Sequence, residues 1–208
     1  MRLQGASRLT AEYVKSIFHN MAFTSGGSKV SAVAALRALA HPTRLRILAH
    51  LQLSGDATAT ECAAEVGESA SSCSYHLRLL AQHGFVEQVP SEDGRERRWH
   101  GTVPSVDFDA GAERDEEFQA ASALARAALL EVSDANTRDY LAAERVFSPA
   151  WREAAAFLQT TIVASPAELV EITHRIQDVL GEYAPSARER KPRGARVVHV
   201  SVRAVPKP

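Results

Sequence analysis

The 208-residue sequence has few cysteines, no long apolar run and a formal net charge of only -1. Its two cysteines, Cys62 and Cys73, are too few for a disulfide framework and lack the paired spacing of a structural zinc site. We interpret both as small buried side chains. No run of about 18 apolar residues could cross a bilayer, and the first 20 residues lack the apolar stretch and cleavage site of a secretory signal. These absences predict a cytoplasmic protein without membrane contact, metal or other cofactor.

Charge is low overall but unevenly distributed. Residues 102–164 contain 5 Lys/Arg and 11 Asp/Glu, whereas residues 184–208 contain 7 Lys/Arg and 1 Asp/Glu. The basic tail could touch DNA, pair with the acidic middle segment or remain solvated. Because the total charge gives no argument for a nucleic-acid partner, motifs and their placement must decide.

Sequence patterns of common enzymes are also missing. The GGSK stretch at residues 26–29 lacks the spacing of a phosphate-binding loop, and neither GxSxG nor HExxH occurs. Glu171, His174 and Asp178 share helical spacing that could place an imidazole between carboxylates. The same predicted helix has an apolar stripe, so we assign these three residues to its solvated side and expect no enzyme and no metal site.

Residues 30–101 show the order of a winged helix-turn-helix domain. Apolar spacing predicts one helix near residues 30–40 and a second that starts at Pro42. A capping box between Thr58 and Glu61 opens a short third helix, and Ser69 caps a fourth that ends near His83. Two strands, at residues 85–90 and 96–101, flank a turn containing Asp-Gly, which is a strong hairpin signal.

The remaining residues predict an arm and a second domain. Residues 1–29 end in TSGGS, a composition typical of a flexible linker. In residues 102–208 the pattern predicts a long helix over about 110–145, and an interruption near 134–136 remains open. It then predicts a strand at 157–163, a capped helix to about 183 and a strand at 196–205. We expect these two strands to pair. The predicted fold class is α+β, mainly α: a winged helix-turn-helix domain followed by a helical/αβ dimerisation or sensing region.

Residues 36–101 resemble the ArsR-type winged-helix regulators of bacteria. The resemblance rests on LRALAHPTRLRIL at 36–48, SYHLRLL at 74–80, GFV at 84–86 and GRERRW at 94–99. It implies a homodimer with the helix near residues 30–40 and later helices at the interface. The C-terminal half is similar to the extension of a long, non-metal branch. Metal-sensing members carry paired cysteines in the helix that reads TECAAE here, and one cysteine disfavours that role.

The predicted recognition helix has two faces. Ala70, Cys73, Leu77 and Leu80 form a stripe that we expect to be buried. The opposite face would enter the major groove, with its N-terminal positions nearest the bases. The DNA-binding candidates on this helix are Ser71, Ser72, Ser74, Tyr75, His76 and Arg78. His76 fits the family pattern, and a structural hydrogen bond and a phosphate contact both remain open for it. In the wing the candidates are Arg95, Arg97 and Arg98, with Trp99 packed inward.

These observations predict a sequence-specific regulator that binds double-stranded DNA as a homodimeric repressor on a near-palindromic operator. The alternative is a winged-helix module that binds another transcription factor, which the nearly balanced charge of residues 31–101 (7 Lys/Arg and 8 Asp/Glu) would allow. A pocket in the C-terminal half could also hold a small-molecule effector.

Overall fold

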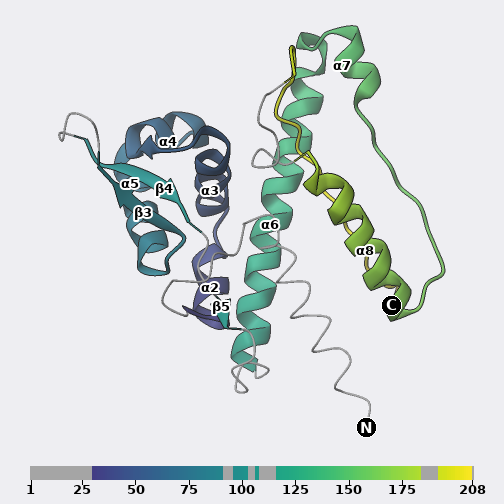
Figure 1. Cartoon of the computed structure of the whole chain (residues 1–208), viewed down its shortest axis with the longest axis horizontal. Helices are drawn as coiled ribbons and strands as arrows, with labels where there is room; N and C mark the ends of the chain where they lie inside the picture. Colours follow the sequence, from purple (N-terminus) through teal and green to yellow (C-terminus); the bar gives the residue numbers. More distant parts are fainter. Residues whose placement is uncertain (1–29, 91–95, 103–105, 108–115, 184–191, 208) are drawn as a thin grey trace. The chain divides into compact units, whose positions relative to one another are not determined.

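A computed structural model describes residues 30–90, 96–102, 106–107, 116–183 and 192–207 of the protein (Figure 1). The chain divides into two compact units, Met1–Val132 and Ser133–Pro208, and the division falls inside the long helix α6, Glu116–Ala143. The predicted arm at residues 1–29 lies outside the described residues. No helix in the described parts of the chain is long and apolar enough to span a membrane.

Four helices precede the hairpin of the first unit: α2 (Ala32–Leu39), α3 (Pro42–Ser54), α4 (Ala59–Val66) and α5 (Ala70–Gln82). Each start after α2 has a side-chain cap, which satisfies amide groups that the helix leaves without partners. His41 Nδ1 accepts a hydrogen bond from the Thr43 amide over 3.2 Å at α3. At α4, Thr58 and Glu61 form the predicted capping box in both directions.

The start and end of α5 confirm the sequence prediction. Ser69 Oγ accepts a hydrogen bond from the Ser72 amide over 3.1 Å at the N-terminus. The helix ends at Gln82, and Gly84 follows in the left-handed region with φ of 71°. Glycine reaches this conformation without the clash that a Cβ atom would cause. The chain therefore reverses sharply into the next strand.

A three-stranded antiparallel sheet completes the winged helix, with strand order β2-β4-β3. Strands β3 (Val86–Val89) and β4 (Arg98–Gly101) form the predicted hairpin, and Gln88 lies opposite Trp99. Strand β2 (Ala57–Thr58) was not predicted because a two-residue strand carries no readable alternation. A separate parallel pair joins β1 (Val30–Ser31) to β5 (Val106–Asp107).

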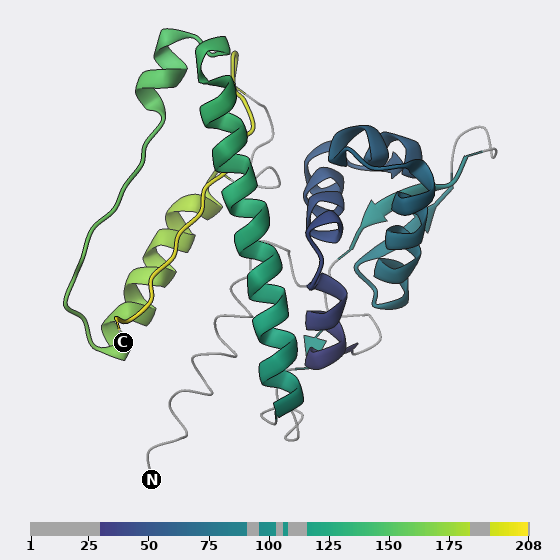
Figure 2. The same ribbon diagram turned by 180° about the vertical axis from the view of Figure 1, so that it is seen from behind.

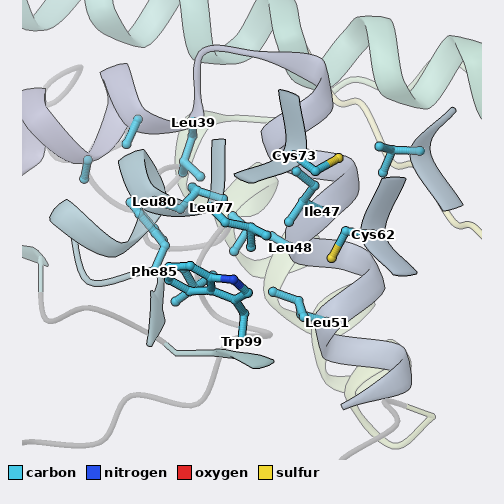
Figure 3. Close-up of a cluster of buried hydrophobic side chains, with 14 of the residues drawn as sticks. Leu39, Ile47, Leu48, Leu51, Cys62, Cys73, Leu77, Leu80, Phe85 and Trp99 are labelled. Atoms are coloured by element: carbon cyan, nitrogen blue, oxygen red, sulfur yellow. The ribbon is translucent and has the colours of Figure 1, made fainter. Parts of the chain in front are cut away.

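The core of the first unit lies between these helices and the hairpin (Figure 3). Phe85 is fully buried and Trp99 points inward, as its position in the wing predicted. Cys73, Leu77 and Leu80 form the buried stripe of α5, but Ala70 is exposed at the first turn, so its inclusion in that stripe was wrong. Other fully buried side chains include Leu36, Ile47 and Cys62.

Both thiols should be unreactive in the folded protein. Cys62 and Cys73 are free and fully buried, and burial raises the pKa of the Cys62 thiol to about 11. The thiolate is the reactive form, so little of it exists near neutral pH. Titration with a thiol reagent should therefore detect both cysteines only after denaturant is added. Rapid labelling of the native protein would contradict this placement.

The second unit contains the end of α6, the 3₁₀ turn η1 (Glu144–Val146), α7 (Pro149–Ala154) and α8 (Pro166–Gly181). Helix α6 runs without a break through residues 134–136, so an interruption there is excluded. The start of α8 confirms the predicted capping box between Ser165 and Glu168, with Pro166 at the first position. Proline fits there because its missing amide would have no helical partner.

Neither of the two strands predicted for the C-terminal half is paired within the described residues. Residues 157–163 and 196–205 run as extended chain, but the structure pairs neither with another described segment. Alternating apolar residues favour an extended backbone, whereas a strand also needs a neighbour for its amides and carbonyls. The apolar stripe of α8 was expected to be buried, yet none of its residues is.

Candidate nucleic-acid interface

Helix α5 presents a polar face opposite its buried stripe. Ser71, Tyr75 and Arg78 are exposed, and Ser72 and Ser74 are partly buried. Tyr75 is 60% exposed although it is a large side chain in the middle of a folded domain. An aromatic ring held out in water on a rigid helix is a typical contact residue, because its body is apolar and its hydroxyl can hydrogen bond.

The hydrogen bonds on this face are local. Arg78 Nε donates to the Ser74 carbonyl over 3.1 Å, one turn back along the helix. The hydroxyls of Ser69 and Ser71 lie 2.9 Å apart at the first turn. The guanidinium of Arg78 keeps its other nitrogen donors, which could form the paired contacts that arginine makes with guanine or phosphate.

His76 points inward rather than toward the polar face. Its side chain is only 8% exposed and its ring centroid lies 4.6 Å from that of His41, at the start of α3. Tyr75 packs edge-on against the same imidazole at 5.3 Å between ring centroids. This geometry argues for a structural role, in which His76 fixes the start of α3 and the orientation of Tyr75, rather than for a direct DNA contact.

Burial of His76 predicts a stability that falls in acid. Desolvation lowers its pKa below the usual 6.5, and His41 and Arg44 lower it further, while Glu68 opposes them. The unfolded chain then binds the proton more tightly than the folded chain. The contribution of His76 to the free energy of unfolding is therefore fully present above about pH 6.5 and declines as the pH falls below that value.

Urea unfolding at pH 7.5 and at pH 5 checks this expectation. His83 and His199 also have lowered pKa values, mainly through desolvation, and should add to the same decline. The His76→Gln variant should show a smaller difference between the two pH values than the wild type. The control His174→Gln changes an exposed histidine on α8 and should not. An unchanged difference in His76→Gln would contradict the assignment.

The described part of the wing is anchored to the rest of the domain. Arg98 Nη2 donates to the Asp56 carbonyl over 2.6 Å and lies 3.5 Å from Glu61 Oε2. His100 Nδ1 lies 2.7 Å from Asp56 Oδ1. These contacts tie β4 to the turn before α4 and engage Nη2 of Arg98. Arg98 thus holds the wing in place, which argues against its predicted contact with DNA.

Arg97 is the wing arginine that remains available. It is exposed immediately before β4, and within the described ranges no hydrogen bond or ion pair engages it. Arg95 belongs to residues 91–95, outside the described part of the chain. The structure thus separates the predicted arginines into an anchored Arg98 and an exposed Arg97.

Arg44 is a candidate that the sequence analysis did not select. It lies in the first turn of α3, and its buried Nε has no hydrogen-bond partner in the described structure. Desolvation lowers the pKa of its guanidinium, and the electrostatic interaction with nearby Tyr75 opposes that shift. The available signal was an arginine two residues after Pro42, in a first turn without an acidic residue. A cation at a helix N-terminus is unfavourable by itself, which points to an anionic partner.

The C-terminal residues considered as metal ligands do not form such a site. Glu171 lies 4.0 Å from Arg175 on the surface of α8, and His174 and Asp178 are exposed. No group of three His, Cys, Asp or Glu side chains in the described residues could hold a metal ion.

Comparison with known proteins agrees with the geometry of the first unit. A family model described as a helix-turn-helix domain matches residues 39–89, which cover α3, α4, α5 and β3. No curated protein sequence matches the chain. A crystal structure of a MarR family transcription regulator aligns with 91% of this chain and 95% of its own at 19% identity, with a TM-score of 0.29. A score this low does not establish a common fold over the full length. The chain contains a winged helix-turn-helix, in which α4 and α5 are the two helices joined by the turn.

Proposed function

We propose that the protein is a sequence-specific DNA-binding transcription regulator of the ArsR type, acting as a homodimeric repressor on a near-palindromic operator. The observation that carries the proposal is the exposed face of α5. Tyr75 and Arg78 are exposed to solvent on a helix whose opposite face is packed into the core. Such a rigid helix can enter the major groove with its contacting side chains already in place.

The surrounding residues support this docking. Ser71 and Ser72 are small, so the first turn of α5 could approach base edges closely. Arg44 and Arg97 would neutralise phosphates on either side of the groove. In this arrangement phosphate contacts position the domain and α5 reads the bases.

The domain assignment follows the same division of labour. Residues 30–101 would bind DNA, and residues 102–208 would dimerise and hold a small-molecule effector. An apolar patch on α8, lined by Ile172, Ile176, Val179 and Leu180, is a candidate surface for either role. Two domains related by a two-fold axis would place their α5 helices in successive major grooves, which matches a palindromic operator.

Electrophoretic mobility shift on the promoter region of the protein's own gene tests the proposal. Binding should survive excess competitor DNA and should weaken steeply between 50 mM and 200 mM salt, because phosphate contacts release counterions. If competitor DNA displaced the labelled promoter fragment as well as unlabelled promoter DNA does, sequence-specific recognition would be contradicted. Absence of binding at every salt concentration, on this region and on genomic fragments, would favour the alternative in which the winged helix binds another protein.

A further inference from the structure

The second unit has almost no core of its own. Among its described residues only Ser133 is buried, and α7 and α8 contain no buried residue at all. A folded unit of this size normally buries more than half of the surface that its unfolded chain exposes. The apolar side chains of this unit therefore need a surface that the described parts of the chain do not supply.

The exposed apolar residues concentrate in the two extended segments, residues 157–163 and 196–205. Leu158 is 95% exposed and Val163 is fully exposed in the first segment. The second segment exposes Val197, Val198, Val200, Val202 and Val205, each by more than half. Valine-rich extended chain is typical of strands, so both segments have the composition and conformation of strands without neighbours.

The arrangement of the two segments explains why they do not pair with each other. Both run opposite to the direction of α8, and in both views they lie apart: residues 196–205 follow α8, whereas residues 157–163 run well to one side of it (Figures 1 and 2). A strand, a helix and a second parallel strand form a common unit in which the strands share one sheet. Here the sheet is incomplete, and each segment keeps an open edge.

The second segment is held in place rather than loose. Arg203 Nη2 forms an ion pair with Asp134 Oδ1 at 2.6 Å, near the start of the unit. The guanidinium of Arg196 lies 5.2 Å from the ring centroid of Phe147, beyond the end of α6. These two contacts fix Arg196 beside the residues that follow α6 and Arg203 beside the C-terminal part of α6. A fixed row of unpaired backbone amides and carbonyls is a template for another strand.

We propose that residues 157–163 and 196–205 of one copy pair with the same segments of a second copy, so that the homodimer contains an intermolecular β-sheet. The inference deepens the dimerisation that the proposed function includes, by naming the surface and its partner. The sheet would satisfy the backbone groups of both segments and cover their apolar side chains. The apolar stripe of α8 could then pack against one face of that sheet.

The area and the charge of the segments fit a second copy. Their nine exposed large apolar side chains offer on the order of 600 Å² of apolar surface, at about 60 to 120 Å² for each complete side chain. A standard interface buries about 800 Å² per partner, polar surface included. Residues 157–163 have no charged side chain, whereas 196–205 contain Arg196, His199 and Arg203. Pairing 157–163 of one copy with 196–205 of the other therefore avoids opposing like charges.

Hydrogen exchange on the full chain, without DNA, tests the pairing whatever its exact register. Sedimentation at the same concentrations would report whether the chain is a dimer. Amides in both segments should exchange slowly when the chain is dimeric and should lose protection as dilution produces monomer. A Val198→Asp/Val200→Asp variant should weaken the dimer at least about tenfold, which is the effect of about 1.4 kcal/mol. It should also speed exchange in both segments.

The matched control is Val146→Asp, the same change at a site that is 85% exposed in the same unit but outside both segments. It should leave the dimer and the exchange rates unchanged. Three results would overturn the inference: a monomeric chain, a dimer in which both segments exchange freely, or protection that does not depend on concentration. Protection lost when residues 1–29 are removed would identify the N-terminal arm as the partner and would also overturn it. Because DNA binding is measured separately, a dimer without this sheet leaves the proposed DNA-binding function untouched, whereas a monomeric chain would also contradict the proposed homodimer.

Discussion

Replacing Tyr75 and Arg78 together with alanine should abolish sequence-specific DNA binding while the protein stays folded. Each well-formed base contact contributes about 1 to 3 kcal/mol of discrimination, and 1.4 kcal/mol corresponds to a tenfold change in affinity. Loss of two contacts, about 2 to 6 kcal/mol together, therefore predicts at least about thirtyfold weaker specific binding. Both side chains are exposed, so their removal takes nothing from the core. A quantitative mobility shift, with circular dichroism as the check on folding, measures the effect.

Gln82→Ala provides the matched control for this variant. Gln82 is exposed on α5, but it occupies the last position of the helix, away from the N-terminal half that lies nearest the bases. Its replacement should leave specific binding within about threefold of wild type, the change expected from about 0.6 kcal/mol. If both variants bound alike, α5 would not be the reading element.

The largest expected loss of stability follows replacement of Phe85 with alanine. Phe85 is fully buried between α5 and the hairpin, and its backbone amide donates to the Leu80 carbonyl over 3.0 Å. Removal of a buried phenyl ring leaves a cavity and typically lowers the free energy of unfolding by about 3 to 5 kcal/mol. Urea unfolding followed by tryptophan fluorescence can measure it, because Trp99 lies in the same core.

Leu53→Ala makes the comparison specific to burial. Leu53 lies near the end of α3 and is 37% exposed, so its truncation leaves no enclosed cavity. We expect it to change the free energy of unfolding by less than about 1 kcal/mol. Similar losses for Phe85→Ala and Leu53→Ala would contradict the core placement of Phe85.

The first unit could be predicted from the sequence because its local signals agree with its tertiary packing. The ends of α4 and α5 were predicted almost to the residue from three local signals: the Thr58–Glu61 capping box, the Ser69 cap and Gly84. The order of helices and hairpin followed from these ends. The small strand β2 was not predicted because two residues give no periodicity. It directly follows Asp56, whose carbonyl anchors the wing through Arg98.

The sequence predicted which face of α5 is exposed, but it did not predict the contacts that individual side chains make. Helical spacing correctly separated the buried Cys73, Leu77 and Leu80 from the exposed Tyr75 and Arg78. It could not show that His76 packs against His41, or that Arg98 reaches the Asp56 carbonyl. Both contacts join residues that are far apart in the sequence, and only the folded backbone brings them together.

The second unit shows the limit of reasoning from local pattern. Valine alternation at residues 196–205 indicates a strand, and the chain there is extended. Whether a strand forms depends on a neighbour, which no periodicity within one segment can supply. The same limit applies to α8, whose apolar stripe is evident in the sequence but is not covered within the described chain.

Selection of bound fragments from the whole genome would show whether α5 reads a specific DNA sequence. Purified wild type and the Tyr75→Ala/Arg78→Ala variant would be compared side by side. Wild type should enrich one motif with two inverted half-sites centred about 10 base pairs, or one helical turn, apart. The variant should enrich none. Equal enrichment by both proteins, or no motif with wild type at any salt concentration, would show that α5 does not read a specific DNA sequence.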